Sequence, residues 1–415
     1  MLTETAPNYR CRFCGERLRE TFVDLGLSPL CETYIDSAHL SAPESFYPLH
    51  AFLCTNCFLI QLPEHVGAEE TFREYAYFSS YSDSWVAHAR EYVDAMIHRV
   101  GLDQHSSVIE VASNDGYLLQ FFKGRGIPVL GIEPARNVAH VAMEKGIPTV
   151  TSFFGRRLAR ELAAGGKQAD LLLGNNVLAH VAEINDFVAG LKLLLRPNGV
   201  ITLEFPHVLR LIEENQFDTI YHEHFSYFSF TTIERILSAS GLKTFDVEEL
   251  SMHGGSLRVF ACHREDQAKS TSDNVTTLRA REASWGVSKL EPYQAFRTRV
   301  EETKHQILRL LIEARARGKS IVGYGAAGKG NTLLNYCGIR TDLLEYTVDR
   351  NPYKQGKYTP GTRIPIFPPE RIRETKPDVV LILPWNLKDE IMAQNAFIRE
   401  WGGQFVVPIP KPHIC

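Results

Sequence analysis

Short apolar runs alternate with amphipathic segments over most of this chain. Between residues 106 and 206 there are five such runs, each about as long as a buried strand, and the stretches between them have helical spacing. Apolar runs without polar alternation are typical of strands that are covered on both faces of a parallel sheet. The pattern predicts a doubly wound α/β domain. Its strands are expected within 106–116, 127–134, 147–154, 169–177 and 198–206.

The segments around this alternation predict further elements. Apolar positions at helical spacing predict one helix from Asp83 to about Val100 and another from Thr231 to about Ser240. Residues 243–250 and 255–263 have the pattern of two strands that close the sheet. Residues 265–318 are polar and helical, and they predict a connecting pair of helices.

A second α/β unit is predicted after residue 318. Its strands are expected in "KSIVGYG", "LEYTVDRNP", "IPIFPPERI" and "PDVVLILPWN". A length of 415 residues is enough for two or three domains that each bury a core. We therefore expect a domain at 1–70, a second at 71–265, and a helical connector with a Rossmann-like domain at 266–415.

Composition and charge exclude some classes of partner. Lys and Arg total 45 and Asp and Glu total 49, so the net charge of −4 gives no electrostatic reason to expect a nucleic acid or an anionic membrane as partner. No run approaches about 18 consecutive apolar residues, and the first residues lack the pattern of a signal peptide. We expect a soluble cytoplasmic protein. The oligomeric state is left open, and a monomer is compatible with the sequence.

Four of the eight cysteines form two C-x2-C pairs, Cys11 with Cys14 and Cys54 with Cys57. In a cytosolic chain two such pairs predict a tetrahedral Zn²⁺ site, because each pair presents two thiolates to one ion. With four cysteine ligands the ion has no open position, so its role is structural. The alternative is two redox-active or merely solvated pairs. Cys31 is a fifth candidate, but a small buried apolar side chain is the simpler interpretation.

The turn after the first strand, "VIEVASNDGYLL", resembles the glycine-rich first motif of class I S-adenosylmethionine-dependent methyltransferases. Small residues at Ala112, Asn114 and Gly116 let the backbone approach the methionine part of the donor. Glu133 ends the second strand, where a carboxylate accepts the ribose hydroxyls. A dinucleotide oxidoreductase shares part of this pattern, but the tight G-x-G is missing. The donor-binding residues expected are Glu110, Ala112, Asn114, Asp115, Gly116, Glu133, Asn175 and Asn176.

The order of the motifs along the whole chain resembles the sugar 3-C-methyltransferases of nucleotide-deoxysugar biosynthesis. The resemblance rests on both cysteine pairs and on "YFSSYSDSW", "ASNDGYLL", "NNVLAHV", "YHEHFSYFS" and "GYGAAGKGN". It implies an N-terminal zinc-binding domain, a central class I methyltransferase domain and a C-terminal Rossmann-like α/β domain. It also implies methylation at C3 of a nucleoside-diphosphate 4-keto-6-deoxy or 2,6-dideoxy hexose. The implied catalytic residues are His224 as general base, Glu223, Tyr221 and His180.

The chemistry of that reaction accounts for the crowded polar segment "YHEH" at 221–224. A C–H bond beside a ketone loses its proton only to a positioned base, and the enolate that forms needs stabilisation. A neutral imidazole suits the base, and a carboxylate such as Glu223 can orient it. If the segment is a strand, His222 and His224 share a face and a metal site is an alternative. Tyr227 as half-buried core and His180 as a structural histidine also stay open.

The glycine-rich loop at 323–331 resembles a dinucleotide fingerprint, with Asp349 about twenty residues further on. Given the resemblance, the loop is expected to hold the diphosphate of the sugar nucleotide, with Lys329 as a cation. Two alternatives for the loop are that it serves only for packing or that it binds the cofactor of an NAD(P)-dependent oxidoreductase. For the reaction, the alternative is methylation of O or N. The substrate-binding residues expected are Tyr77, Tyr81, His222, Lys329, Asn331, Lys354 and Tyr358.

Overall fold

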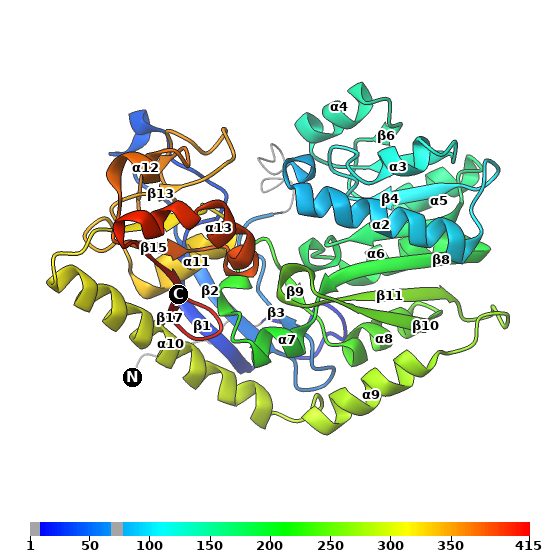
Figure 1. Ribbon diagram of the computed structural model, residues 1–415. Helices are drawn as coiled ribbons and strands as arrows, with labels where there is room; N and C mark the ends of the chain where they lie inside the picture. The colour runs from blue at the N-terminus through cyan, green and yellow to red at the C-terminus, as the bar shows by residue number, and fades with distance from the viewer. Residues whose placement is uncertain (1–8, 68–77) are drawn as a thin grey trace. The chain divides into compact units, whose positions relative to one another are not determined.

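The computed structural model describes residues 9–67 and 78–415, and the chain divides into two compact units. The first unit contains residues 1–19, 53–208 and 225–288, and the second contains residues 20–52, 209–224 and 289–415. Each unit is built from three separate stretches of chain, as the colours of Figure 1 show. This interleaving cannot be read from the sequence pattern. The domain boundaries expected at 70 and 265 stay predictions.

A seven-stranded sheet forms the middle of the first unit (Figure 1). The strand order is β10-β11-β8-β7-β4-β5-β6, in which β4 to β8 are parallel and β10 and β11 are antiparallel. The α/β pattern and the closing antiparallel pair expected from the sequence are confirmed. The strands are β4 (Val108–Val111), β5 (Val129–Ile132), β6 (Thr149–Val150), β7 (Ala169–Asn175), β8 (Leu195–Pro206), β10 (Leu242–Leu250) and β11 (Ser256–His263).

Helix α2 (Asp83–Val100) covers one face of this sheet. Its start is set by Ser82, whose side chain accepts from the backbone N–H of Trp85 at 3.3 Å, and its end by Gly101, which has a left-handed φ of 71°. Tyr92, Val93 and Met96 pack against residues of the sheet in the buried core. The helix therefore begins and ends where the sequence predicts.

The remaining elements of the first unit connect and cover the sheet. Ser229 caps α8, its side chain accepting from Thr232 N at 3.0 Å. The helices are α3 (Leu119–Lys123), α4 (Arg136–Glu144), α5 (Arg156–Ala164), α6 (Ile184–Leu194), α8 (Phe230–Ala239) and α9 (Asp273–Trp285). Short pieces are β3 (Ile60–Gln61), which pairs with β9 (Ser226–Tyr227), and the 3-10 turns η2 (Ser79–Tyr81), η3 (Leu178–His180) and η5 (Met252–Gly254).

The second unit contains a six-stranded sheet of order β14-β13-β12-β15-β16-β17. All pairs are parallel except the last, in which β17 is antiparallel to β16. The chain leaves β12 for β13 on one side and returns to β15 on the other. The carboxyl ends of the neighbouring strands β12 and β15 are therefore the topological switch point. The strands are β12 (Ile321–Tyr324), β13 (Thr347–Val348), β14 (Ile366–Phe367), β15 (Val379–Ile382), β16 (Gln404–Val407) and β17 (His413–Ile414).

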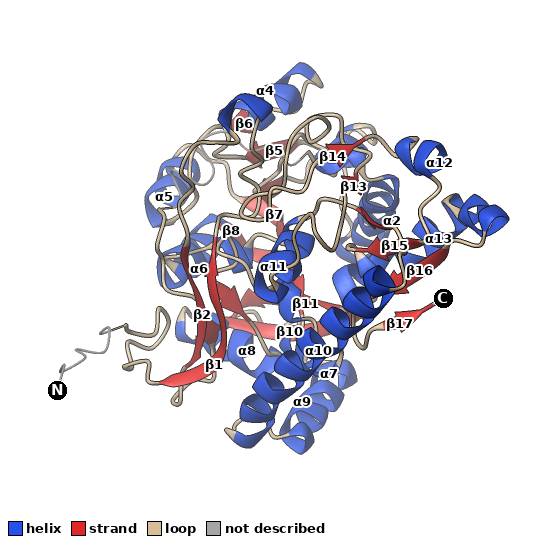
Figure 2. Ribbon diagram, turned by 90° about the vertical axis from the view of Figure 1, so that its left-hand side faces the viewer, coloured by secondary structure: helices blue, strands red, loops and turns tan. Residues whose placement is uncertain are grey.

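The same unit includes the long strands β1 (Glu20–Ser28) and β2 (Tyr47–Leu53), which lie side by side (Figure 2). Helix α10 (Glu291–Ala316) contacts β1, and the stacked rings of Phe22 and Phe296 lie 4.8 Å apart. The other pieces are α7 (Val208–Glu213), α11 (Gly328–Cys337), α12 (Arg371–Thr375), α13 (Lys388–Gln394), η1 (Ser37–His39), η4 (Phe217–Thr219), η6 (Trp385–Leu387) and η7 (Ala396–Trp401).

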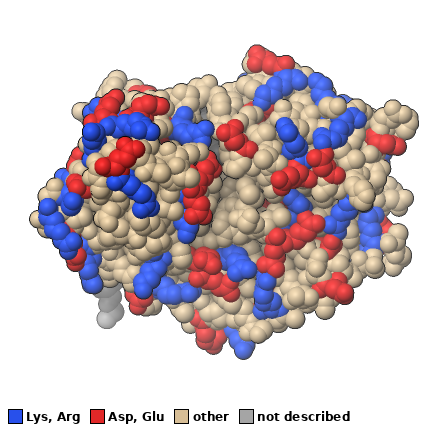
Figure 3. All heavy atoms as spheres, in the orientation of Figure 1, with Lys and Arg blue, Asp and Glu red and all other residues tan. Residues whose placement is uncertain are grey.

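Among the described residues, no helix combines the length and the hydropathy that crossing a membrane requires. Over the face drawn in Figure 3, basic and acidic side chains are interspersed. This agrees with the small net charge of −4. The cytoplasmic location expected from the sequence stays a prediction.

Candidate active site and metal centre

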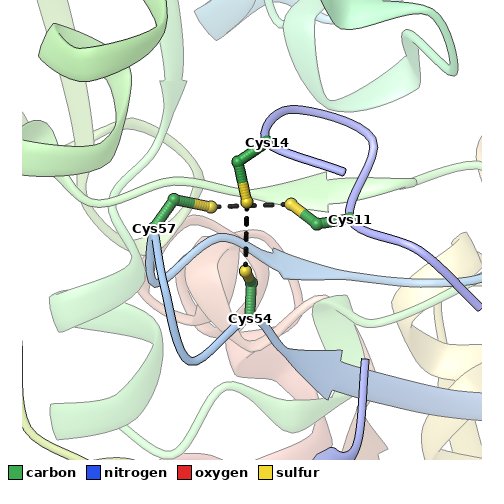
Figure 4. A group of neighbouring side chains, drawn as sticks. All are labelled: Cys11, Cys14, Cys54 and Cys57. Atoms are coloured by element: carbon green, nitrogen blue, oxygen red, sulfur yellow. Dashed lines mark hydrogen bonds between the residues drawn. The ribbon is translucent and has the colours of Figure 1, made fainter. Parts of the chain in front are cut away.

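Four cysteine sulfurs of the first unit point toward one centre (Figure 4). Cys11 Sγ lies 3.5 Å from Cys57 Sγ, Cys14 Sγ lies 3.5 Å from Cys54 Sγ, and all four sulfurs lie within 4.8 Å of one another. Four thiolates on a tetrahedral zinc ion at about 2.3 Å are roughly 3.8 Å apart. The arrangement therefore fits a Zn²⁺ ion with four cysteine ligands, and it leaves no coordination position for a substrate.

The two cysteine pairs share one backbone geometry. Gly15 N donates to Cys11 O and Phe58 N donates to Cys54 O, each at 2.9 Å. Gly15 and Phe58 both have a left-handed φ, of 74° and 60°. Gln61 supports the site because its amide donates to Cys11 Sγ at 3.2 Å. Such outer contacts fix the orientation of a thiolate ligand.

The turn after β4 has the backbone conformation for which glycine is usually needed. Ala112, Asn114 and Gly116 have φ values of 58°, 50° and 75°. These are the three positions where the sequence motif expects glycine or a small residue. A Cβ on Gly116 would lie 2.9 Å from Ile147 Cγ1. The departures from the glycine pattern are thus in residues that still adopt the left-handed turn.

Three buried carboxyl groups surround this turn. Glu110, in β4, is 1% exposed, and burial is the main cause that raises its pKa well above the ordinary value. The charges of Glu133 and Asp115 raise the pKa of Glu110 further. Asp115 pairs with Lys145 Nζ at 3.1 Å and also bonds the Ser80 hydroxyl. A cationic ligand beside these groups would lower their pKa values and favour their charged forms.

Glu133, directly after β5, has two backbone partners. Its Oε2 accepts from Asn114 N at 3.0 Å and its Oε1 from Ala135 N at 2.9 Å. Burial raises the pKa of this carboxyl to about 7, against the two hydrogen bonds. The residue expected to bind ribose therefore also holds the turn at 112–116 in place.

Several polar atoms at this edge of the sheet are buried and lack a hydrogen-bond partner among the described residues. They are Glu110 Oε2, Asp115 Oδ1, and both amide atoms of Asn175 at the end of β7. Burying polar groups without partners is costly unless a ligand satisfies them. These atoms fit a donor with sulfonium, ammonium and hydroxyl groups. Asn176, with φ of 55°, and the half-buried His180 follow in the same loop.

In the second unit, Tyr221 to His224 form a tight turn instead of a strand. His224 N donates to Tyr221 O at 2.9 Å, and the two rings lie 4.0 Å apart. The interpretation in which His222 and His224 share a strand face is therefore wrong. Among the described residues, the four cysteines are the only group of three or more potential ligands that lie close enough to hold a metal.

The two histidines of this turn have different partners and different exposure. His224 is half-buried, and its Nδ1 lies 3.1 Å from Thr219 O. A carbonyl oxygen only accepts, so Nδ1 carries the hydrogen and Nε2 carries the lone pair of the neutral ring. His222 is 8% exposed, and its Nε2 donates to Pro48 O at 3.2 Å. Each ring therefore has one nitrogen that can accept a proton, and His224 is the more exposed of the two.

Glu223 is buried beside Cys31, which the sequence analysis interprets as a small buried apolar side chain. Cys31 Sγ donates to Glu223 Oε1 at 3.5 Å, and Cys31 is 3% exposed. Burial, and then the charges of Glu223 and Glu32, raise the pKa of the thiol well above its ordinary value. Cys31 therefore stays protonated and remains a donor.

The side chains expected to bind the sugar nucleotide in the second unit have partners within the protein. Lys329 Nζ bonds Asn386 Oδ1 at 2.9 Å, and Lys354 Nζ donates to Ala326 O at 2.9 Å. Lys354 also pairs with Glu32 at 3.4 Å. Asn331 donates to Cys31 O at 2.5 Å, and the backbone of Tyr358 bridges to Ile35.

The carboxylate of Asp349 accepts hydrogen bonds from the backbone of the glycine loop after β12 and from its own turn. Asp349 Oδ2 accepts from Ala326 N at 2.7 Å and its Oδ1 from Asn351 N at 2.8 Å. In a dinucleotide site this carboxylate faces the ribose. No contact of the loop favours the oxidoreductase alternative. In the first unit, Tyr81 is 56% exposed, and Tyr77 lies outside the described residues.

Comparisons with known proteins cover nearly the whole chain. Three family models match it: a zinc binding domain at 11–72, a methyltransferase domain at 85–247 and a C-methyltransferase C-terminal domain at 251–410. The chain is 35% identical to the C-methyltransferase NovU of Streptomyces niveus over 413 residues, which covers 98% of this chain and 97% of that protein.

Two solved structures are similar to part of the chain. One is magnesium protoporphyrin IX methyltransferase of Synechocystis PCC 6803, at 17% identity and a TM-score of 0.33, over 44% of this chain and 82% of that one. The other is PH0226 of Pyrococcus horikoshii OT3, at 14% identity and a TM-score of 0.38, over 48% of this chain and all of that one.

Proposed function

Because the chain belongs to the S-adenosylmethionine-dependent C-methyltransferases with a zinc-binding and a C-terminal domain, we propose that it methylates C3 of a nucleoside-diphosphate 4-keto-deoxyhexose. S-adenosylmethionine supplies the methyl group, and zinc is the structural metal. The fold is the class I methyltransferase α/β fold with an N-terminal zinc-binding domain and a C-terminal α/β domain. The substrate, the carbon and the base are the proposal.

The hydrogen bond from His224 Nδ1 to Thr219 O carries the proposal. It fixes the tautomer in which Nε2 accepts a proton, and a neutral imidazole has a pKa near the working pH. In the proposed reaction Nε2 takes the C3 proton, and the electron pair moves toward the ketone oxygen as the enolate. Tyr221, whose ring lies against His224, is the proposed donor to that oxygen. Glu223 is proposed to orient a sugar hydroxyl.

In the first unit, the turn at 112–116, Glu133 and Asn175 are proposed to hold the donor. His180, in the loop after β7, is proposed to contact the sugar. Methylation of carbon is favoured over O or N because the relative that matches over the full length is a C-methyltransferase.

Solvent exchange tests the base directly. In D₂O, with the demethylated donor and a 4-keto sugar nucleotide, the enzyme should exchange the C3 proton for deuterium without methyl transfer. His224→Asn should lose exchange and methylation by about 10²–10⁴-fold and still bind both ligands. His413→Asn, which changes an exposed histidine of the same unit, should retain exchange. A His224 variant within tenfold of wild type would exclude this base.

A further inference from the structure

The switch point of the second unit's sheet lies between β12 and β15, and folds of this type bind their ligands there. The loops that follow these strands carry Lys329 on one side and Trp385 with Asn386 on the other. Lys329 Nζ lies 4.7 Å from the centroid of the Trp385 ring and bonds Asn386. The site therefore offers a cation and an indole N–H to an anionic group.

A carboxylate of the same unit already takes these donors. Asp218, in η4, is fully buried, and its Oδ2 accepts from Trp385 Nε1 at 2.7 Å. The positive charge of Lys329 attracts it. Burial raises the pKa of Asp218 to about 7, while the charge of Lys329, the indole N–H and the backbone N–H groups of Asp218 and Thr219 favour the carboxylate.

The flanking residues of η4 are held by α11. Thr332 Oγ1 donates to Ile220 O at 3.0 Å, and the Phe217 ring meets the Tyr336 ring edge-on at 5.4 Å. Thr219 lies between Asp218 and Ile220, and its carbonyl accepts from His224 Nδ1. The bond that fixes the histidine tautomer is therefore set on a segment that is anchored on both sides.

We propose that Asp218, Lys329, Trp385 and Asn386, here called the Asp218 clamp, are positioning residues for His224, and that the switch point holds this segment in place of a nucleotide. The inference rests on the proposed role of His224. The clamp fixes the position of Thr219 O, which accepts the hydrogen bond from His224 Nδ1. That bond keeps the proton on Nδ1, so Nε2 has the lone pair that accepts a proton. An error of about 1 Å in such an alignment costs up to 10²-fold in rate.

Trp385→Phe tests the clamp, because it keeps an aromatic ring under Lys329 and removes the N–H. The matched control is Trp401→Phe, which removes an indole bond of the same kind to Pro377 O at 3.0 Å in the same unit. Trp385→Phe should lower kcat and the C3 exchange rate about 10- to 100-fold. KM for the sugar nucleotide and donor affinity should stay within about twofold. Trp401→Phe should leave both rates near wild type.

Two further variants separate positioning from ligand binding. Asp218→Asn keeps an acceptor for Trp385 and should retain more activity than Asp218→Leu. Lys329→Met should lower kcat. A raised KM with an unchanged kcat in Lys329→Met would instead assign the switch point to the diphosphate and overturn the proposal. Equal rates in Trp385→Phe and Trp401→Phe would overturn it as well.

A measurement without substrate makes the result independent of the sugar reaction. In ¹⁵N-histidine-labelled protein, the His224 signals, assigned by comparison with His224→Asn, should show the Nδ1–H tautomer in wild type and in Trp401→Phe. They should show mixed tautomers in Trp385→Phe. An unchanged spectrum would refute the clamp. If wild type exchanges no keto sugar but the spectra behave as expected, the proposed function fails and the positioning of His224 stands.

Discussion

Removing the amide of Asn175 should separate donor binding from folding. Asn175 ends β7 and is 8% exposed, and neither of its amide atoms has a hydrogen-bond partner in the described part of the protein. A buried polar group without a partner destabilises a fold by about 1–3 kcal/mol. Asn175→Ala removes that cost together with some packing, so the free energy of unfolding should change by less than about 1 kcal/mol.

The affinity for S-adenosylmethionine should fall in the same variant. If the donor satisfies the amide, its loss costs about 1–3 kcal/mol of binding free energy, which is roughly 5- to 150-fold in Kd. Titration calorimetry measures the affinity, and urea unfolding measures the stability.

Asn215→Ala is the matched control. Asn215 is 5% exposed, but its Nδ2 donates to Thr303 Oγ1 at 2.7 Å. The same substitution there should lower the free energy of unfolding by about 1–3 kcal/mol and leave donor affinity unchanged. If Asn175→Ala is destabilised like this control and binds the donor normally, the amide has a structural role and the donor site has been assigned wrongly.

Other parts of the first unit give further predictions. Cys54→Ser should lower both the zinc content, expected at about one ion per chain, and the Tm; full stability of metal-free protein would contradict a structural ion. Glu133→Ala should weaken donor binding in calorimetry and also destabilise the fold by roughly 1–3 kcal/mol, because two backbone N–H groups lose their acceptor. A stable variant with normal affinity would remove Glu133 from the site. Glu282 accepts from His207 Nε2 at 2.7 Å and from Thr231 N at 2.8 Å; although burial acts to raise the pKa of Glu282, these contacts lower it overall. Its stabilisation should be present above the ordinary glutamate pKa of about 4.3 and be lost as the pH falls through the lowered value. Urea unfolding at a series of pH values should therefore show a smaller acid loss in Glu282→Gln than in wild type; equal slopes would contradict this.

Features set by nearby residues were predictable from the sequence. Helix α2 has its cap residues, Ser82 and Gly101, next to its ends, so its bounds follow from local chemistry. The turn at 112–116 was found because Ala112, Asn114 and Gly116 stand where the methyltransferase motif has glycine or a small residue, and all three have a left-handed φ. The metal site was also predictable, because each C-x2-C spacing is local and presents two thiolates to one ion.

Features set by distant residues were not predictable. Residues 221–224 are polar and give no local sign of a turn, because their conformation depends on partners far along the chain, such as Cys31 for Glu223. No sequence pattern near Trp385 or Asp218 indicates that their side chains form a hydrogen bond. The only sign was that Asp218 is a polar residue close to 221–224. Lys354 was expected to bind the substrate, but its side chain is 7% exposed and contacts Ala326 O and Glu32 within the protein.

The interleaving of the two units has a consequence for synthesis on the ribosome. The last stretch of the first unit ends at residue 288, so that unit can close before the remaining 289–415 have been translated. The second unit also contains residues 20–52 and 209–224, which are synthesised earlier. The segment 209–224 lacks its contacts with α11 and Trp385 until these have been translated. Long-range pairing of this kind is slow and exposes apolar surface to aggregation. A chain that stops near residue 288 should therefore fold its donor-binding sheet and still leave the turn that carries His224 without its support.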